Sequence, residues 1–227
     1  MLTHPREESR LQHPEVRALT DRDFAQAKAV MGRAFENYPL LLYVAPDDRR
    51  RPRATCALYG SVMRYCLSAG EVYTTPDVAG AACWLPPHRP FPTFLRMVRS
   101  GMLKLPFQFG WTGFSRLSAF DTIAEKIHHE HAPGPHWYLW AIGIEPGRQG
   151  QGLGRELMQP IFAQADAAGL PCYLETHKES NTVIYDRCGF RIVCEAQVPG
   201  HPGKIWGMLR EPVGTDERNT ANGTDSR

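Results

Sequence analysis

The sequence contains no long uninterrupted apolar segment, because charged residues, prolines or glycines break every hydrophobic stretch. A helix that crosses a bilayer needs about 20 consecutive, predominantly apolar residues, so we expect no membrane partner. Residues 1–10 are polar and charged, and no apolar core typical of an export signal follows them. We therefore expect a cytoplasmic protein.

Neither sign of charge is in clear excess. The chain has 26 Lys and Arg residues against 24 Asp and Glu, a formal net charge of +2. Such a balance gives no reason to expect a nucleic-acid partner. The six cysteines form no Cys-x-x-Cys pair, and the histidines between His128 and His136 lack a His-Glu-x-x-His arrangement. We therefore predict no metal site, reduced and mostly buried thiols, and a solvated helix end at the histidines.

The chain also lacks a Gly/Ser-rich linker and an internal repeat, so we expect one domain over residues 14–211. The polar segments 1–13 and 212–227 cannot bury apolar surface and are predicted to be flexible tails. Between them, predicted strands alternate with predicted helices, and the last two strands have no helix between them. This order predicts an α/β (α+β) fold, in which a mixed sheet carries helices on its faces.

The hydrophobic pattern places the elements. Strands are expected at 15–19, 71–75, 79–85, 137–144, 172–176, 190–196 and 204–210. Helices are expected at 53–68, 152–168 and 181–187, and from Phe24 to the Asn37–Pro39 stop, after a capping box formed by Thr20 and Asp23. Pro160 should kink its helix, or the helix ends there and restarts. Segment 88–136 is expected to hold helices near 91–105 and 115–129.

The most informative stretch is WYLWAIGIEPGRQGQGLGRELMQPIF. A strand is followed by four closely spaced glycines, and a helix begins almost at once. Where side chains are absent, backbone N–H groups can approach an anion, and the start of a helix adds free donors and partial positive charge. The segment is typical of a pyrophosphate-binding loop. It contains Gly147, Arg148, Gly150, Gly152, Gly154 and Arg155.

Three kinds of protein build such a loop. A P-loop requires Gly-Lys-Ser/Thr, whereas Arg155 and Glu156 follow Gly154 here. A Rossmann fingerprint requires glycine or alanine where Arg155 stands, and it follows the first strand of a domain. Glu175 does lie about 20 residues further on, where a ribose-binding acid would be, so a dinucleotide-dependent oxidoreductase stays a hypothesis. The pattern that matches in full is Gln/Arg-x-x-Gly-x-Gly/Ala, at Gln149-Gly150-Gln151-Gly152-Leu153-Gly154.

This motif and a second one downstream, Asn181-Thr-Val-Ile-Tyr185-Asp-Arg-Cys-Gly189-Phe190, resemble the GNAT superfamily of N-acetyltransferases. The likeness covers nearly all of residues 15–210 and includes the opening VRALTDRDFAQAKAVMGRAF. Within the superfamily the chain is most similar to puromycin N-acetyltransferase and its relatives. The matching residues are Ala34-Phe35, Tyr38-Pro39, Trp84, Leu174-Glu175-Thr176 and Pro160.

The resemblance implies a GNAT-like domain: a mixed, mostly antiparallel sheet of about seven strands, with a helical insertion between the third and fourth strands. It implies acetyl-CoA as co-substrate, with no metal. The acetyl-CoA site would comprise Ile142, Gly143, Ile144, Arg148, Gln149, Gly150, Gln151, Gly152, Leu153, Gly154, Arg155, Asn181 and Tyr185. A backbone N–H of residues 142–144 would bind the oxyanion, and the Tyr185 phenol would protonate the departing thiolate.

The general base is not fixed by the sequence. The candidates are Glu175, which matches the family's Leu-Glu-Thr, and Tyr138, His136, His177 or a chain of waters. The alternative for Glu175 is a structural role, in which it accepts backbone hydrogen bonds. The likeness to the family places Phe35, Tyr38, Trp84 and Tyr138 on the acceptor side. Segment 88–136 would also lie on that side, and its aromatic residues would line an apolar pocket, belong to the core or form a dimer contact. These are Phe91, Phe94, Trp111, Phe114 and Phe120.

The expected function is therefore acetyl transfer by direct attack of a primary amine on acetyl-CoA. The acceptor would be a small molecule, including antibiotic-like amines, or a peptide, and the protein a monomer or homodimer. The alternative from another class is a non-catalytic acyl-CoA-binding sensor on the same fold, which release of CoA in the presence of amines distinguishes.

Overall fold

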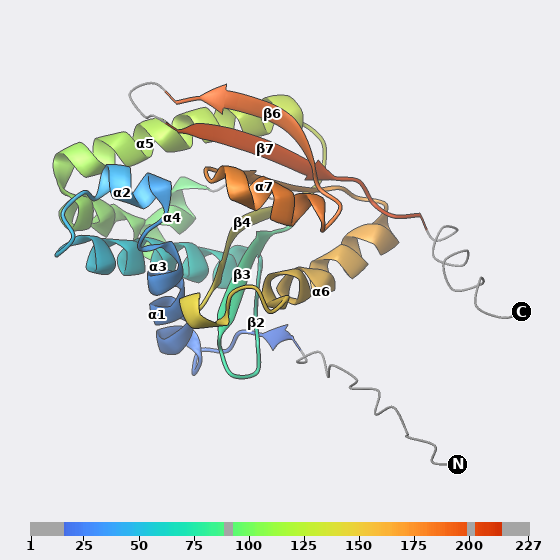
Figure 1. The fold of residues 1–227 in the computed structure, drawn as a ribbon, viewed down its shortest axis with the longest axis horizontal. Coiled ribbons are helices and arrows are strands. Elements are labelled where there is room, and N and C mark those ends of the chain that lie inside the picture. The colour runs from blue at the N-terminus through green and yellow to red at the C-terminus, as the bar shows by residue number, and fades with distance from the viewer. Residues whose placement is uncertain (1–15, 89–92, 199–202, 215–227) are drawn as a thin grey trace, which may run out of the picture.

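In the computed structural model, which describes residues 16–88, 93–198 and 203–214, seven strands form one sheet in the order β1-β2-β3-β4-β5-β7-β6 (Figure 1). All neighbours are antiparallel except β4 and β5, which are parallel. The predicted mixed, mostly antiparallel sheet is confirmed. The strands are β1 (Arg17–Ala18), β2 (Glu71–Thr74), β3 (Gly80–Leu85), β4 (Trp137–Ile144), β5 (Cys172–Thr176), β6 (Arg191–Gln197) and β7 (Lys204–Arg210).

Helices cover both faces of the sheet. Figure 1 shows α1 and α3 on one side of β3 and β4, and α6 on the other, while α5 lies along β6 and β7. Each face has its own cluster of buried apolar side chains. The helices are α1 (Phe24–Phe35), α2 (Pro39–Val44), α3 (Arg51–Ala69), α4 (Phe94–Ser100), α5 (Leu105–His131), α6 (Leu153–Ala168) and α7 (Glu179–Asp186), with short 3-10 turns η1 (Met102–Lys104) and η2 (Pro146–Arg148).

The spacing of apolar residues explains α6. Its buried side chains recur every three or four positions, which gives one apolar stripe against the sheet; they are Leu153, Leu157, Met158, Ile161, Phe162 and Ala165. The helix ends at Gly169, whose φ of 64° lets its N–H reach the last carbonyl groups. It runs without interruption through Pro160, so the alternative in which the helix ends and restarts there is wrong.

β4 carries a β-bulge at its centre. Leu139 faces Trp84 and Ala141 faces Cys83 on the neighbouring strand β3. Trp140 between them therefore has no partner on β3. An extra residue of this kind bends the strand that carries it, and the bend falls where β4 reaches its other neighbour, β5.

β4 and β5 separate at this bulge. Their parallel pairing covers three residues and ends with Leu139 opposite Leu174. Beyond that point, residues 140–144 of β4 pair with β3 alone within the described ranges. One edge of β4 is consequently available for a ligand that adds to the sheet.

Several details differ from the sequence prediction. Helix α2 begins at Pro39, a position that was predicted to end a helix, because proline fits the first helical turn as well as it fits a stop. The expected capping box at Thr20 is half formed: Asp23 accepts hydrogen bonds from the Thr20 N–H and hydroxyl, but the Asp23 N–H donates to the Thr20 carbonyl oxygen and not to its hydroxyl. Val213, assigned to the C-terminal tail, instead donates its N–H to Asp166.

Some of the predicted segments and residues lie outside the part of the chain that the structure describes. Residues 1–13, Glu15, Phe91 and residues 215–227 lie outside it. None of the described helices combines the length and apolar character needed to cross a bilayer. All six cysteines are free, three of them fully buried.

Candidate active site

The glycine loop after β4 is open on its outer side. Gly150 and Gly152 adopt φ values of 78° and 84°, a left-handed conformation that favours glycine. A Cβ added at Gly147, Gly150, Gly152 or Gly154 would meet nothing within 4 Å. Protein packing therefore does not explain these glycines, and the bare backbone faces space that an anion can enter. Gly152 caps α6 without a side-chain partner, which leaves the first N–H groups of the helix available.

The two arginines beside the loop differ. Arg148 forms an ion pair with Asp77 at 2.7 Å and donates to the Gln151 side chain, so its charge is already partly neutralised. Arg155 is exposed, and within the described residues it makes no ion pair. Gln149 donates its side-chain amide to the carbonyl of Ile144 and thereby ties the loop back to the end of β4.

A cavity of about 80 Å³ lies where β4 and β5 separate. One part of its lining is aromatic, with Phe35 stacked on Tyr59 at a centroid distance of 3.9 Å. The other part is polar and comes from β5 and α7. The lining residues are Phe35, Tyr38, Leu40, Tyr59, Leu139, Trp140, Ala141, Ile142, Leu174, Glu175, His177, Asn181 and Tyr185.

Glu175 brings a carboxyl group into this cavity. Its side chain is only 5% exposed, and burial raises its pKa to about 8, against the smaller lowering effect of the Tyr138 and Tyr173 hydroxyls. A carboxyl group with such a pKa takes up and releases a proton near neutral pH. This makes Glu175 a candidate general base.

Tyr185 and Asn181 reach the same cavity from α7. Burial raises the pKa of the Tyr185 phenol, which keeps it protonated and able to donate. Asn181 donates to the hydroxyl of Thr176, which also bonds the Tyr38 hydroxyl at 3.0 Å, and Tyr38 accepts the His177 N–H. This network fixes the end of β5 against α2 and α7. The motif Asn-x-x-x-Tyr thus places an anchoring amide and a phenol on one side of one helix.

The sequence and the fold are similar to those of known proteins. The sequence model of the Acetyltransferase (GNAT) family matches residues 110–190. An uncharacterized N-acetyltransferase of Schizosaccharomyces pombe is 26% identical over 181 residues, which are 74% of this chain and 71% of that protein.

Solved structures share the fold over most of the chain. One is the histone acetyltransferase HPA2 and related acetyltransferase of Corynebacterium glutamicum, with a TM-score of 0.61, 20% identity, and 88% of this chain and 97% of that chain covered. Another is arylalkylamine N-acetyltransferase 2 of Aedes aegypti, with a TM-score of 0.53, 13% identity, and 87% and 98% covered.

The fold is that of the GNAT acetyltransferases. The family match and the named relative support an N-acetyltransferase. The narrower likeness to puromycin N-acetyltransferase stays a prediction from the sequence.

Within this GNAT fold, two of the four predicted acceptor-side residues lie elsewhere. Trp84 is fully buried on the sheet face that α6 covers, where it packs edge-on against Phe162. Tyr138 is buried behind the cavity beside Glu175 and does not line it. Phe35 and Tyr38 do line it. Gly143, predicted to contact the cofactor, has no room for a side chain because Met31 and Phe35 of α1 pack against it, so only its backbone is available.

The inserted segment contributes no described residue to the cavity lining. Phe94 and Trp111 are 75% and 80% exposed, whereas Phe120 is buried and contacts the His177 ring edge-on at 4.4 Å. Phe114 is partly buried against the core. Of the three predicted alternatives, the core placement describes Phe120 and Phe114, and none of the described aromatic side chains of this segment lines the cavity between β4 and β5.

The predicted solvated helix end at the histidines is also wrong in part. His128 and His136 are 3% and 1% exposed, and their Nε2 atoms lie 2.6 Å apart. His129 remains exposed. Among the described residues, no group of three metal-binding side chains is arranged around a common point. The sequence missed the buried pair because His136 follows the helix and returns to it only in three dimensions.

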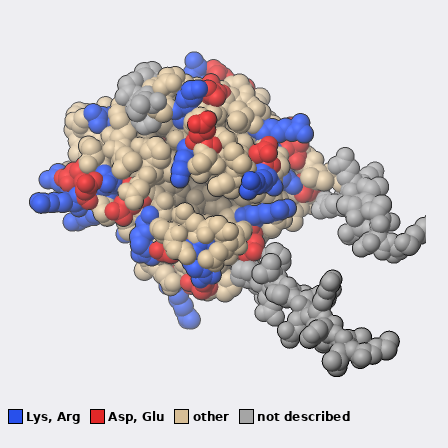
Figure 2. Space-filling view, in the orientation of Figure 1, with Lys and Arg blue, Asp and Glu red and all other residues tan. Residues whose placement is uncertain are grey.

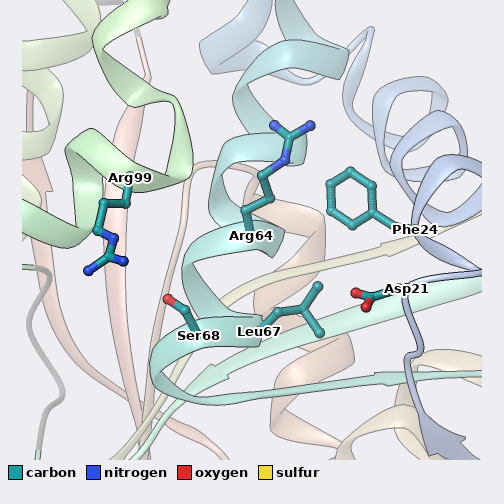
Figure 3. Close-up of a pocket in the computed structure, with 6 residues that line it drawn as sticks. All are labelled: Asp21, Phe24, Arg64, Leu67, Ser68 and Arg99. Carbon is teal, nitrogen blue, oxygen red and sulfur yellow. The ribbon is translucent and has the colours of Figure 1, made fainter.

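A larger hollow of about 480 Å³ lies on the outer side of α1, α3 and α4 (Figure 3). Arg64 lies over the Phe24 ring at 4.8 Å, and Arg99 approaches from α4. This hollow shares no lining residue with the cavity between β4 and β5. On the face seen in Figure 2, Lys and Arg are interspersed with Asp and Glu, so charge alone marks no binding surface there.

Burial of Glu175 predicts a specific dependence of stability on pH. In the unfolded chain the carboxyl group titrates near its ordinary pKa of 4.5, and in the folded protein near 8. Between these values only the folded protein holds the proton, so this group's contribution to stability declines as pH rises. Glu175→Gln is expected to remove that decline in melting temperatures measured at pH 5, 6.5 and 8. Glu179→Gln, on the exposed face of α7, should keep the wild-type slope; an unchanged slope in Glu175→Gln would contradict the buried acid.

Proposed function

We propose that the protein transfers the acetyl group of acetyl-CoA directly to the primary amine of a small molecule. The observation that carries this proposal is the cavity itself, because it brings a buried carboxyl group and a phenol to the point where β4 leaves β5. An amine needs a proton acceptor and a departing thiolate needs a proton donor. Glu175 and Tyr185 supply these from β5 and α7.

The glycine loop and the free edge of β4 suit the two ends of acetyl-CoA. The loop offers backbone N–H groups, a helix start and the exposed Arg155 to a pyrophosphate. The pantetheine arm would then run along residues 142–144, whose backbone can pair with its amides as a strand does. The same segment would place an N–H against the oxygen on which negative charge develops.

The acceptor side favours a narrow amine with an apolar body. The cavity is small, and its walls at Phe35, Tyr38, Tyr59 and Trp140 are aromatic. Aromatic faces attract cations and apolar groups, and Glu175 adds a carboxyl group to the same lining. The named mosquito relative acts on arylalkylamines, which have this shape.

An amine panel tests the proposal. Release of CoA thiol from acetyl-CoA is measured with phenethylamine, tryptamine, agmatine, spermidine, puromycin and a short peptide. We expect turnover with at least one small amine, fastest for those with an aromatic body, and mass spectrometry should show the acetylated amine. Binding of acetyl-CoA without turnover on an extended panel would instead indicate an acyl-CoA sensor, and binding of NAD alone an oxidoreductase.

Gly154→Asp should abolish tight binding of acetyl-CoA. Gly154 lies within α6, where aspartate fits the backbone, and a Cβ there meets nothing within 4 Å, so the fold should survive. The new carboxylate would repel the pyrophosphate at the helix start. A ligand at a hundredfold excess over Kd stabilises a protein by about 2.7 kcal/mol, so the melting shift seen in wild type should vanish. Gly154→Ala is the control and should retain most of it; a full shift in Gly154→Asp would place the phosphates elsewhere.

Tyr185→Phe should lower kcat about 10²–10⁴-fold, the usual contribution of general acid catalysis, and leave the Kd for acetyl-CoA within about threefold. The ring is retained, so its edge-on contact with Phe190 at 5.9 Å should survive. Turnover with the best amine of the panel gives kcat, and calorimetry gives Kd. Tyr73→Phe on β2, at a residue that does not line the cavity, is the matched control. A variant at position 185 with wild-type kcat would show that water protonates the thiolate.

A further inference from the structure

The carboxyl group of Glu175 has a second neighbour on the side away from the cavity. Its Oε1 atom is buried without a hydrogen-bond partner among the described residues, and it lies 3.6 Å from Nδ1 of His128. The two side chains are 5% and 3% exposed. The separation is slightly longer than a hydrogen bond.

A chain of contacts behind His128 determines which of its nitrogens carries the proton. His136 Nδ1 lies 2.6 Å from the carbonyl oxygen of Gly134, and a carbonyl oxygen can only accept, so this nitrogen carries hydrogen. Burial lowers the pKa of both imidazoles, that of His128 to about 3, so both rings are neutral. His136 Nε2 is then an acceptor.

The next step follows from the short contact between the rings. Because His136 Nε2 accepts, His128 Nε2 at 2.6 Å must donate to it. His128 Nδ1 is therefore left without a proton, and its lone pair faces Glu175 Oε1. The backbone carbonyl of Gly134 thus fixes the tautomer of His136, which in turn fixes the tautomer of His128.

We propose that His136 and His128 are positioning residues for Glu175: they present an unprotonated nitrogen to its inner oxygen and so favour the carboxylic acid over the carboxylate. A lone pair repels the ionised group and accepts a hydrogen bond from the neutral one. This inference rests on the proposed function for its purpose. The proton that leaves the amine nitrogen adds to the cavity-side oxygen, and a half-turn of the carboxyl group about its Cγ–Cδ bond brings the O–H against His128 Nδ1.

Several other polar and titratable groups surround Glu175 and His128, and the substitutions at position 136 described below leave all of them in place. The Tyr138 hydroxyl faces Glu175 from β4 and the Tyr173 hydroxyl from β5, where its ring also stacks on His128 at 4.4 Å. Charged or titratable groups that act on Glu175, His128 or Tyr173 from α5 and β6 are Asp121, His129 and Cys194.

Histidine NMR on the intact resting protein tests the tautomers without any acetyl transfer. With ¹⁵N-labelled imidazoles at pH 7, we expect the proton of His128 on Nε2 and that of His136 on Nδ1. The opposite tautomer of His128, or a doubly protonated ring, would overturn the proposal. Because this measurement needs no substrate, its result is independent of whether the protein transfers acetyl groups.

His136→Phe tests the control of Glu175 at a distance. Without an acceptor at position 136, His128 gains by moving its proton to Nδ1 and donating it to Glu175, which stabilises the carboxylate. A hydrogen bond to a charged group corresponds to a pKa change of about one unit, so we expect the midpoint of Glu175, followed by carboxyl ¹³C NMR, to fall by about that much. The pH midpoint of kcat/KM should fall with it.

His136→Gln is the matched variant, since its amide oxygen can still accept from His128 Nε2, and it should keep the wild-type midpoint. Melting curves confirm that both variants fold. An unchanged Glu175 midpoint in folded His136→Phe, or the same fall in both variants, would overturn the proposal. A shifted carboxyl midpoint in a protein that acetylates no amine would leave this inference standing and remove the proposed function.

Discussion

The separation of β4 from β5 is the constraint on which the rest of the site depends. Two parallel strands that stayed paired would fill the space between them with their own hydrogen bonds. Here the pairing ends after three residues, and the bulge at Trp140 bends β4 at that point. The cavity, the free edge of β4 and the glycine loop at its end then follow one another along a single strand. A ligand with a phosphate end and a reactive end can therefore be held along one line.

The two faces of the sheet bury different kinds of side chain around the separation of β4 and β5. On the face of α6 the buried side chains are almost entirely apolar, which gives the glycine loop a rigid base. On the face of α5, buried tyrosines and histidines surround Glu175. The inserted segment thus contributes from behind the cavity: Phe120 supports His177, and His128 supports Glu175.

The sequence predicted the strands around the site to the residue, because β4, β5 and β7 are bounded by turn residues and follow clear apolar runs. It could not place Trp84. All six residues of β3 are buried, so the alternation that distinguishes the two faces of an ordinary strand is absent. The glycine loop could be predicted from the sequence because its backbone conformation depends on local sequence. The His128–His136 pair was not, since it depends on how α5 lies against β4. The roles of Glu175 and Tyr185 remain predictions that the geometry supports.

Burial of Glu175 also bears on how an amine becomes a nucleophile. An alkyl ammonium ion has a pKa of about 10.4 in water, above the value of about 8 for Glu175, so proton transfer between the separate groups is unfavourable. Inside a cavity that excludes most water the comparison changes, because the ammonium–carboxylate pair loses solvation on both ions, whereas the amine and the carboxylic acid lose little. The same burial that costs the empty protein stability thus favours the neutral pair. The unprotonated Nδ1 of His128 acts in the same direction, because it favours the acid form of Glu175 at the moment when the amine must be uncharged.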